Sequence, residues 1–285
     1  MSEPGSPRRL ALILNTASGR FVRGDSDALI RSIENHDTVE TVWLLDETRP
    51  ERISEAFGEG INGLAIAGGD GTIRSVAEMV LSSKTDCPLL PLPFGTANIL
   101  VKRLYGNRDA VDLLDQAATA RPRPFRPGLM NGSVFLVAAA LGFPSTMARA
   151  RERLREFDGA PPLLSFSKRL AASARQAFSP SIHYQTDTSG RGRKRASGIY
   201  LDLADPDAET LRFIAVKWRE MGDVARMGWA FLSNPDRLPT GNIRHIRASA
   251  RKPMAAMLDG EPIYTDAKVD IRRADHSLQF LSPDS

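Results

Sequence analysis

The stretch Leu64-Ala-Ile-Ala-Gly-Gly-Asp-Gly-Thr72 joins an apolar run directly to a glycine-rich turn. Leu64 to Ala67 has the composition of a strand that is buried on both faces. Ile73 to Leu81, which comes after the turn, carries apolar residues at the spacing of one helix face. A buried strand, a glycine turn and a helix in immediate succession are typical of a parallel α/β sheet, which we therefore expect here.

Two further pairs of strand and loop flank this one along the chain. Leu10 to Leu14 is an apolar run that ends at Asn15-Thr-Ala-Ser-Gly19. Leu89 to Leu92 is a second such run, and it ends at Pro93-Phe-Gly-Thr-Ala-Asn98. Between them we expect helices beginning near residues 27 and 53 and a strand over 39–45. This alternation predicts that residues 1–125 form a doubly wound, parallel α/β domain.

The pattern changes after Ala120-Arg-Pro-Arg-Pro-Phe-Arg-Pro127, whose three prolines favour a segment that crosses between domains. Strand-like segments dominate the second half of the chain, and they are 133–141, 181–184, 198–203, 210–216, 242–248, 255–258 and 267–271. Residues 145–178 have helical character instead. We predict that residues 126–285 form a β-sandwich domain with one helical insertion.

Composition and charge restrict the class of protein. The 285 residues are 42% hydrophobic and carry a net charge of +4, which suits a globular protein of two domains. No apolar run approaches the roughly 18–20 residues that cross a bilayer, and the lone Cys87 cannot form an internal disulfide, so we expect a cytoplasmic location. Residues 102–195 carry 17 Lys or Arg against 7 Asp or Glu. That excess suits an anionic membrane surface, a phosphorylated ligand, nucleic acid or a solvated face.

The glycine turn Gly68-Gly-Asp-Gly-Thr72 lies between strand and helix, where α/β sheets bind ligands. Its glycines allow positive φ and a close approach to a ligand, and the next helix directs unpaired N–H groups at phosphate. Asp70 would repel phosphate unless a divalent cation lies between them, so the turn also predicts a metal site. Taken alone, the motif is equally typical of a tight turn with a capping aspartate. Three such loops after three strands should meet at one edge of the sheet, and together they predict a nucleotide site.

A fourth motif, Leu258-Asp-Gly-Glu261, lies far downstream between two predicted strands. Asp-Gly is a common hairpin turn, which is one interpretation. The other is that the turn presents Asp259 and Glu261 to a substrate, where a carboxylate could accept the proton of an alcohol.

The four motifs together resemble the diacylglycerol kinase catalytic family, which includes bacterial lipid kinases and sphingosine kinases. The shared patterns are Asn-x-x-Ser-Gly, Gly-Gly-Asp-Gly-Thr, Pro-x-Gly-Thr-x-Asn and Asp-Gly-Glu, in this order. The resemblance spans about residues 8–282. It implies an α/β domain followed by a β-sandwich, with ATP and Mg²⁺ in the cleft between them. The implied reaction transfers the γ-phosphoryl group of ATP to a lipid hydroxyl, such as that of diacylglycerol.

The resemblance also implies a role for each matching position. The positions implied to bind the nucleotide are Asn15, Ser18, Gly19, Gly68, Gly69, Gly71, Thr72, Gly95, Thr96 and Asn98. Asp70 matches the metal-binding and catalytic carboxylate of the phosphate loop. Asp259 matches the general base and Glu261 its acidic neighbour.

Two departures from the family pattern concern the metal and the third loop. Many relatives have Asn-Asp-Phe-Ala where this chain has Asn98-Ile-Leu-Val101. The acidic loop of the second domain is Asp205-Pro-Asp-Ala-Glu-Thr210, which lacks the glycine found in relatives. Asp205 and Asp207 are therefore the candidates for a second Mg²⁺ site.

Other functions are left open at this point. An NAD kinase shares Gly-Gly-Asp-Gly-Thr, but its relatives carry an Asn-Glu pair that this chain lacks. A non-catalytic nucleotide or lipid sensor on the same fold is a second alternative. Nucleic acid is not expected as a partner, because basic and aromatic residues do not interleave.

A lipid kinase without an anchor must visit an anionic membrane surface at the inner membrane, and residues 163–178 have the pattern of a basic amphipathic helix that could lie there. A homodimer is left open.

Overall fold

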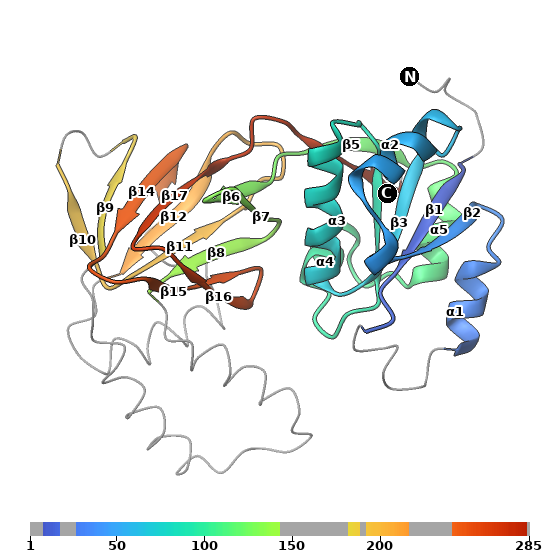
Figure 1. Ribbon diagram of the computed structural model, residues 1–285, viewed down its shortest axis with the longest axis horizontal. Helices are drawn as coiled ribbons and strands as arrows, with labels where there is room; N and C mark the ends of the chain where they lie inside the picture. Colours follow the sequence, from blue (N-terminus) through green and yellow to red (C-terminus); the bar gives the residue numbers. More distant parts are fainter. Residues whose placement is uncertain (1–7, 18–26, 143–181, 189–191, 217–240, 284–285) are drawn as a thin grey trace, which may run out of the picture. The chain divides into compact units, whose positions relative to one another are not determined.

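The computed structural model describes residues 8–17, 27–142, 182–188, 192–216 and 241–283. The chain divides into two compact units (Figure 1). Unit 1 is Met1–Pro127 together with Asp275–Ser285, and unit 2 is Gly128–Ala274.

Unit 1 is built on one six-stranded sheet of order β2-β1-β3-β4-β18-β5. Its strands are β1 (Leu10–Leu14), β2 (Val39–Leu44), β3 (Gly63–Gly68), β4 (Leu89–Pro93), β5 (Arg121–Phe125) and β18 (Leu278–Ser282). The first four and β18 are parallel, whereas β5 runs antiparallel to β18 at the edge. Every residue of β1 and β3 is buried, as expected for strands covered on both faces.

Among its described residues, unit 1 has five α-helices beside the sheet. They are α1 (Asp27–Glu34), α2 (Pro50–Gly58), α3 (Asp70–Ser83), α4 (Ile99–Tyr105) and α5 (Ala110–Ala117), and a short 3₁₀ helix, η1 (Leu45–Glu47), comes after β2. Helix α1 packs against α5, and α2 packs against α3. Strand β2 lies on one side of β1, whereas β3 and β4 lie on the other side. Because parallel crossovers are right-handed, this change in the order of the strands puts the two helix pairs on opposite faces of the sheet. The predicted α/β sheet is confirmed, and β1 and β3 form its switch point.

The described residues of unit 2 form two six-stranded antiparallel sheets, β10-β9-β14-β17-β6-β7 and β13-β12-β11-β8-β15-β16. The strands are β6 (Gly128–Met130), β7 (Ser133–Phe135), β8 (Ala138–Leu141), β9 (Ile182–Thr186), β10 (Lys194–Ala196), β11 (Gly198–Asp202), β12 (Leu211–Val216), β13 (Gly241–Ile243), β14 (His245–Ser249), β15 (Met254–Leu258), β16 (Glu261–Thr265) and β17 (Lys268–Arg273). Tyr184 of β9 and Phe213 of β12 bring their ring centroids to 5.5 Å, so the two sheets contact each other face to face. The predicted helical insertion at 145–178 lies outside the described residues.

The C-terminal strand corrects the predicted domain boundary. We assigned residues 275–285 to the second domain, but β18 pairs with β4 and β5 in unit 1. Phe280 packs edge-on against Phe125 at 4.9 Å between centroids, and Leu281 is fully buried. Burial of these apolar side chains in the first core holds the end of the chain there. None of the described helices is long and apolar enough to span a bilayer.

Candidate active site

The loops after β1 and β3 are joined by a side-chain hydrogen bond. Asn15 comes directly after β1, and its Nδ2 donates to Oγ1 of Thr72 at 2.8 Å. The backbone N–H of Asn15 also donates to the carbonyl of Ala67 at 3.1 Å. Thr72 lies in the first turn of α3 and is buried. The end of β1 is therefore fixed to the start of α3, at the switch point of the sheet.

The loops after β3 and β4 pack backbone against backbone. A Cβ placed on Gly95 would lie 2.6 Å from the Cα of Gly69, which leaves no room for a side chain. A Cβ on Gly68 would lie 2.5 Å from the side chain of Thr72. None of these three glycines has a positive φ, so the conformational freedom that we expected them to supply is not used. The contact between the two loops requires glycine at Gly95, whereas the side chain of Thr72 in the following helix requires it at Gly68.

Asp70 connects the phosphate loop to the helix after β4. Its Oδ2 accepts a hydrogen bond from the N–H of Ile99 at 3.2 Å, and its Oδ1 accepts one from Leu100 at 3.1 Å. The carboxylate therefore caps the N-terminus of α4, where a negative charge is favourable. The capping aspartate that the sequence left open as an alternative is observed, although it caps α4 and not its own helix.

The third loop is closed by Asn98, which adopts a left-handed conformation at φ 50°. Its Oδ1 accepts a hydrogen bond from the N–H of Gly95 at 2.7 Å, and the side chain is buried. Asparagine tolerates this backbone conformation better than most residues. Asn98 thus shapes the loop that brings Gly95 against Gly69.

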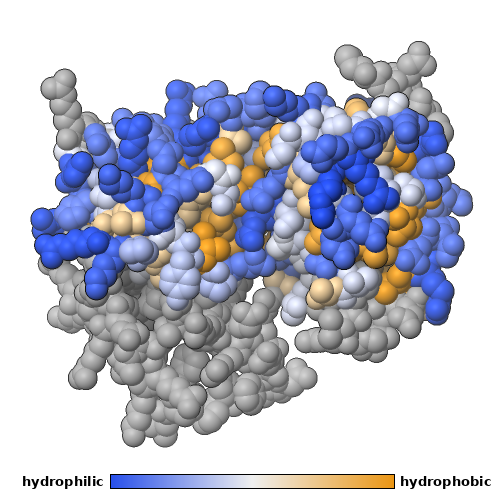
Figure 2. All heavy atoms as spheres, in the orientation of Figure 1, coloured by the Kyte–Doolittle hydropathy of each residue, from blue (hydrophilic) through white to orange (hydrophobic). Residues whose placement is uncertain are grey.

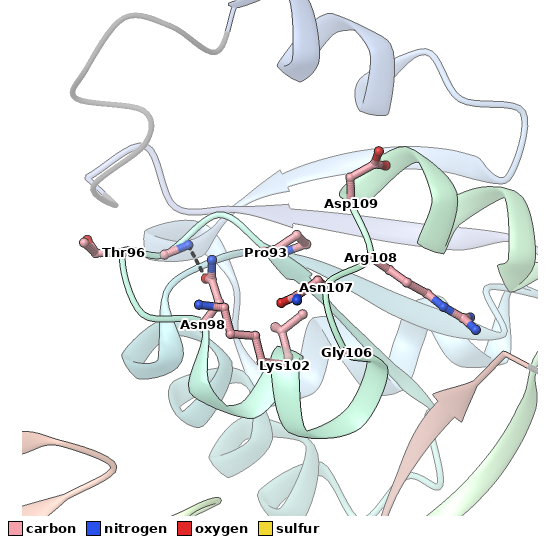
Figure 3. A pocket seen from close by; sticks show the side chains of 10 residues that line it. Pro93, Thr96, Asn98, Lys102, Gly106, Asn107, Arg108 and Asp109 are labelled. Atoms are coloured by element: carbon pink, nitrogen blue, oxygen red, sulfur yellow. Dashed lines mark hydrogen bonds between the residues drawn. The ribbon is translucent and has the colours of Figure 1, made fainter. Parts of the chain in front are cut away.

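A pocket of about 420 Å³ lies beside this loop, at the carboxyl end of β4. It is lined by Pro93, Gly95, Thr96, Asn98, Val101, Lys102, Gly106, Asn107, Arg108 and Asp109. Figure 3 shows Asn98, Lys102 and Asn107 around it. Arg108 is held by the side chain of Gln116, and Asp109 caps α5 by accepting from the N–H of Asp112 at 2.9 Å.

Lys102 differs from the other charged residues of the pocket. It is exposed, and within the part of the chain that the structure describes its ammonium group makes no hydrogen bond or ion pair. A lysine in this setting is a free positive charge at the edge of the pocket, which suits an anionic ligand group.

The fourth motif forms the predicted hairpin turn in unit 2. Asp259 and Gly260 have φ of 51° and 90°, the pair of positive values that a two-residue turn of type I′ requires. The carboxylate of Asp259 is buried and accepts three backbone hydrogen bonds, from Leu136 at 2.8 Å, Val137 at 2.7 Å and Ala138 at 3.0 Å. It anchors the turn to the segment between β7 and β8.

Glu261, two residues further on, is exposed at the start of β16. The two carboxylates of the motif therefore lie in different surroundings. A general base needs an accessible oxygen. Glu261 is an exposed residue, whereas three N–H donors bind the carboxylate of the buried Asp259. The base role that the resemblance implies for Asp259 stays a prediction.

The other predicted metal ligands are only partly brought together. Asp205 Oδ1 accepts from the N–H of Asp207 at 3.1 Å, which is a local turn. Within the described ranges, no group of three or more His, Cys, Asp or Glu side chains could hold a metal ion. A Mg²⁺ ion at Asp70 fits the donor set only if phosphate oxygens and water complete its shell, as is usual for this ion. Ser18 and Gly19 lie outside the described residues, while Gly71 lies in the first turn of α3.

Comparison with known proteins finds a family to which this part of the chain is similar. Residues 9–130 match the family model described as the diacylglycerol kinase catalytic domain. These residues are similar to the diacylglycerol kinase catalytic domain family. The domain contains the three linked loops and the pocket, whereas Asp259 and Glu261 lie beyond it.

Curated relatives of this catalytic domain carry the name "Probable lipid kinase YegS-like". The protein from Pseudomonas putida is 33% identical over 162 residues, which are 52% of this chain and 53% of that protein. The protein from Pseudomonas fluorescens Pf-5 is 27% identical over 229 residues, 75% of each chain. The chain thus spans about half the length of the first relative and three quarters of the second.

Solved structures share the fold. A diacylglycerol kinase from Bacillus anthracis has a TM-score of 0.66 at 13% identity, with 97% of each chain covered. An NAD kinase from Archaeoglobus fulgidus in complex with ATP has a TM-score of 0.51 at 15% identity, covering 97% of this chain and 94% of that one. At these identities the likeness concerns the fold alone.

Sequence reasoning missed the pocket residues Lys102, Asn107 and Arg108 of the catalytic domain. They match none of the four motifs. The one available signal was position, because Lys102 lies in α4, four residues after Asn98, the N-cap of that helix.

Proposed function

We propose that the chain is an ATP-dependent lipid kinase that transfers the γ-phosphoryl group to a lipid hydroxyl. The observation that carries this proposal is the junction of three loops at the carboxyl edge of a parallel sheet. The Asn15–Thr72 bond, the Asp70 cap on α4 and the Gly69–Gly95 contact link the three loops to one another. The names of the curated relatives support a lipid as the acceptor.

The junction offers several donors to a nucleotide. Helix α3 starts at Asp70, and its N-cap residue, Gly69, supplies no side-chain cap, so first-turn N–H groups are available for phosphate. Lys102 adds a positive charge at the neighbouring pocket. Phosphoryl transfer depends mainly on positioning and on charge stabilisation by Mg²⁺ and such donors. Asp70 would hold the ion while its hydrogen bonds to α4 keep the carboxylate in place.

The acceptor hydroxyl must lose a proton, and the turn at 259–261 supplies the carboxylates for it. We assign proton acceptance to the exposed Glu261 and the positioning of the turn to Asp259. This assignment exchanges the two roles that the resemblance implies. In both assignments the two carboxylates serve the removal of the proton from the acceptor hydroxyl. Separate substitution of Asp259 and of Glu261 shows which of them accepts the proton and which positions the turn.

Turnover of ATP in the presence of lipid micelles tests the proposal. The kinase function requires that one class of lipid alcohol raises ATP turnover well above the rate without lipid. A non-catalytic sensor would bind ATP or lipid without turnover. An NAD kinase would consume ATP with NAD and not with lipid, and either result would overturn the proposal.

A further inference from the structure

One sheet of unit 2 has a basic outer face. Four cations point outward from three of its strands: Arg195 from β10, Arg247 from β14, and Lys268 and Arg272 from β17. We call these four residues and Asp270, also on β17, the basic face.

Strand register places these side chains on the same side of the sheet. Arg247 pairs with Asp270, and Lys268 pairs with Ser249, which in turn pairs with His183, the partner of Arg195. Residues directly opposite each other on neighbouring strands project to the same face. Ile246 of β14 and Val269 and Ile271 of β17, which alternate with the outward residues, are apolar and buried. The alternation is that of a sheet with one face in the core and one in solvent.

This face carries more cations than carboxylates. Four cations and one carboxylate give it a net charge of +3, while the whole chain of 285 residues carries +4. Arg247 exposes 77% of its side chain and lies 3.5 Å from Asp270, whose carboxylate also bonds His245 at 2.7 Å. In Figure 2 the part of the molecule that contains β9, β10 and β14 presents mostly hydrophilic residues.

We infer that the basic face docks on an anionic lipid bilayer. The inference rests on the proposed function, because a kinase whose acceptor is a lipid must reach the surface where that lipid resides. An extended sheet face with several cations is complementary to a plane of anionic head groups. The outward residues of β10, β14 and β17 include no large apolar side chain, so attachment is electrostatic, without insertion, and weakens with salt.

Sedimentation with vesicles tests this surface on the full chain, in the absence of ATP. The vesicles contain phosphatidylcholine alone, or phosphatidylcholine with about one third phosphatidylglycerol. The test variant is Arg247→Gln with Lys268→Gln. The matched control is Arg121→Gln with Arg123→Gln, which removes the same charge from exposed positions of β5 in unit 1.

The wild-type protein and the control should bind the anionic vesicles alike and leave the neutral ones. Because each cation near an anionic surface contributes about fivefold in affinity, the test variant should bind about 25-fold more weakly. Equal binding of the test variant and the wild type would overturn the inference. So would an equal loss in the control, which would mean that total charge matters and not this face. Preferential binding of the wild type to duplex DNA at the same salt concentration would overturn it as well.

Failure of the docking surface and failure of the proposed function are distinguishable. In detergent micelles, where no bilayer has to be reached, the test variant should phosphorylate lipid as fast as the wild type. If neither protein phosphorylates any lipid in micelles, the proposed function fails, and vesicle sedimentation still decides on the surface.

Discussion

Substitution of Asp259 by asparagine separates an anchoring role from a catalytic one. The carboxylate accepts three backbone N–H bonds at 2.7 to 3.0 Å and is buried. An asparagine side chain has one acceptor oxygen, so it keeps at most two of these bonds and turns its NH₂ group toward a buried N–H donor. The loss of one charge-assisted bond and the unsatisfied donor together cost about 3 kcal/mol.

That cost should be visible as a lower melting temperature. Unit 2 runs from Gly128 to Ala274, and for a domain of this size each kcal/mol shifts Tm by about 2–4 °C, so a fall of about 6–12 °C is expected. Thermal unfolding followed by circular dichroism measures it. Glu261→Gln is the matched control, since it also removes one carboxylate charge from the same turn but at an exposed position. Its Tm should stay within about 1 °C of the wild type.

Steady-state kinetics on the same two variants completes the comparison. Glu261→Gln should lower kcat by about 10²- to 10⁴-fold with little effect on ATP affinity, as expected when a general base is removed. The reasoning fails if Asp259→Asn keeps the wild-type Tm and loses kcat alone, because Asp259 would then be the base. It fails equally if Glu261→Gln keeps full activity.

The remaining predictions concern unit 1. Gly95→Ala should destabilise the protein by about 1–3 kcal/mol in denaturant titrations, because its Cβ would lie 2.6 Å from the Gly69 backbone. Gly69→Ala, whose Cβ would find ordinary contact at 3.5 Å, should leave stability unchanged or raise it by up to about 1 kcal/mol, yet weaken ATP binding in calorimetry. Asp70→Asn should cost about 1 kcal/mol through the weakened cap on α4 and abolish most activity, and near-normal turnover at limiting Mg²⁺ would contradict its metal role. Burial raises the pKa of the Cys87 thiol to about 12, so a thiol reagent at pH 8 should label it only after unfolding, and rapid labelling of the native protein would contradict its place in the core.

Local sequence patterns were sufficient for the frame of unit 1. The apolar runs ending at Leu14, Ala67 and Leu92 are buried strands, and the polar loops after them meet as expected. The reason is that a parallel strand buried on both faces appears in the sequence as a continuous apolar run. The carboxyl ends of such strands necessarily share one edge of the sheet. The turn at Asp259-Gly260 was equally accessible, since few other dipeptides adopt two positive φ angles.

Contacts between distant segments could not be predicted in this way. Strand β18 pairs with β5, more than 150 residues earlier, and nothing in Leu278 to Ser282 indicates which sheet it will join. The need for glycine at Gly95 arises from Gly69, and the N–H partners of Asp259 lie more than 120 residues away. These features arise from packing in three dimensions. A sequence motif identifies which residue matters, but it does not show which distant contact requires that residue.

The most direct test of the central claim is the chemical identity of the product. The purified chain is incubated with ATP labelled in the γ-phosphoryl group, Mg²⁺ and a panel of detergent-solubilised lipid alcohols, and the lipid extract is analysed by mass spectrometry. One lipid class should gain a single labelled phosphoryl group, and Asp70→Asn should yield none. Binding of ATP without any labelled lipid, across a panel that includes diacylglycerols, sphingoid bases and polyprenols, would contradict that claim.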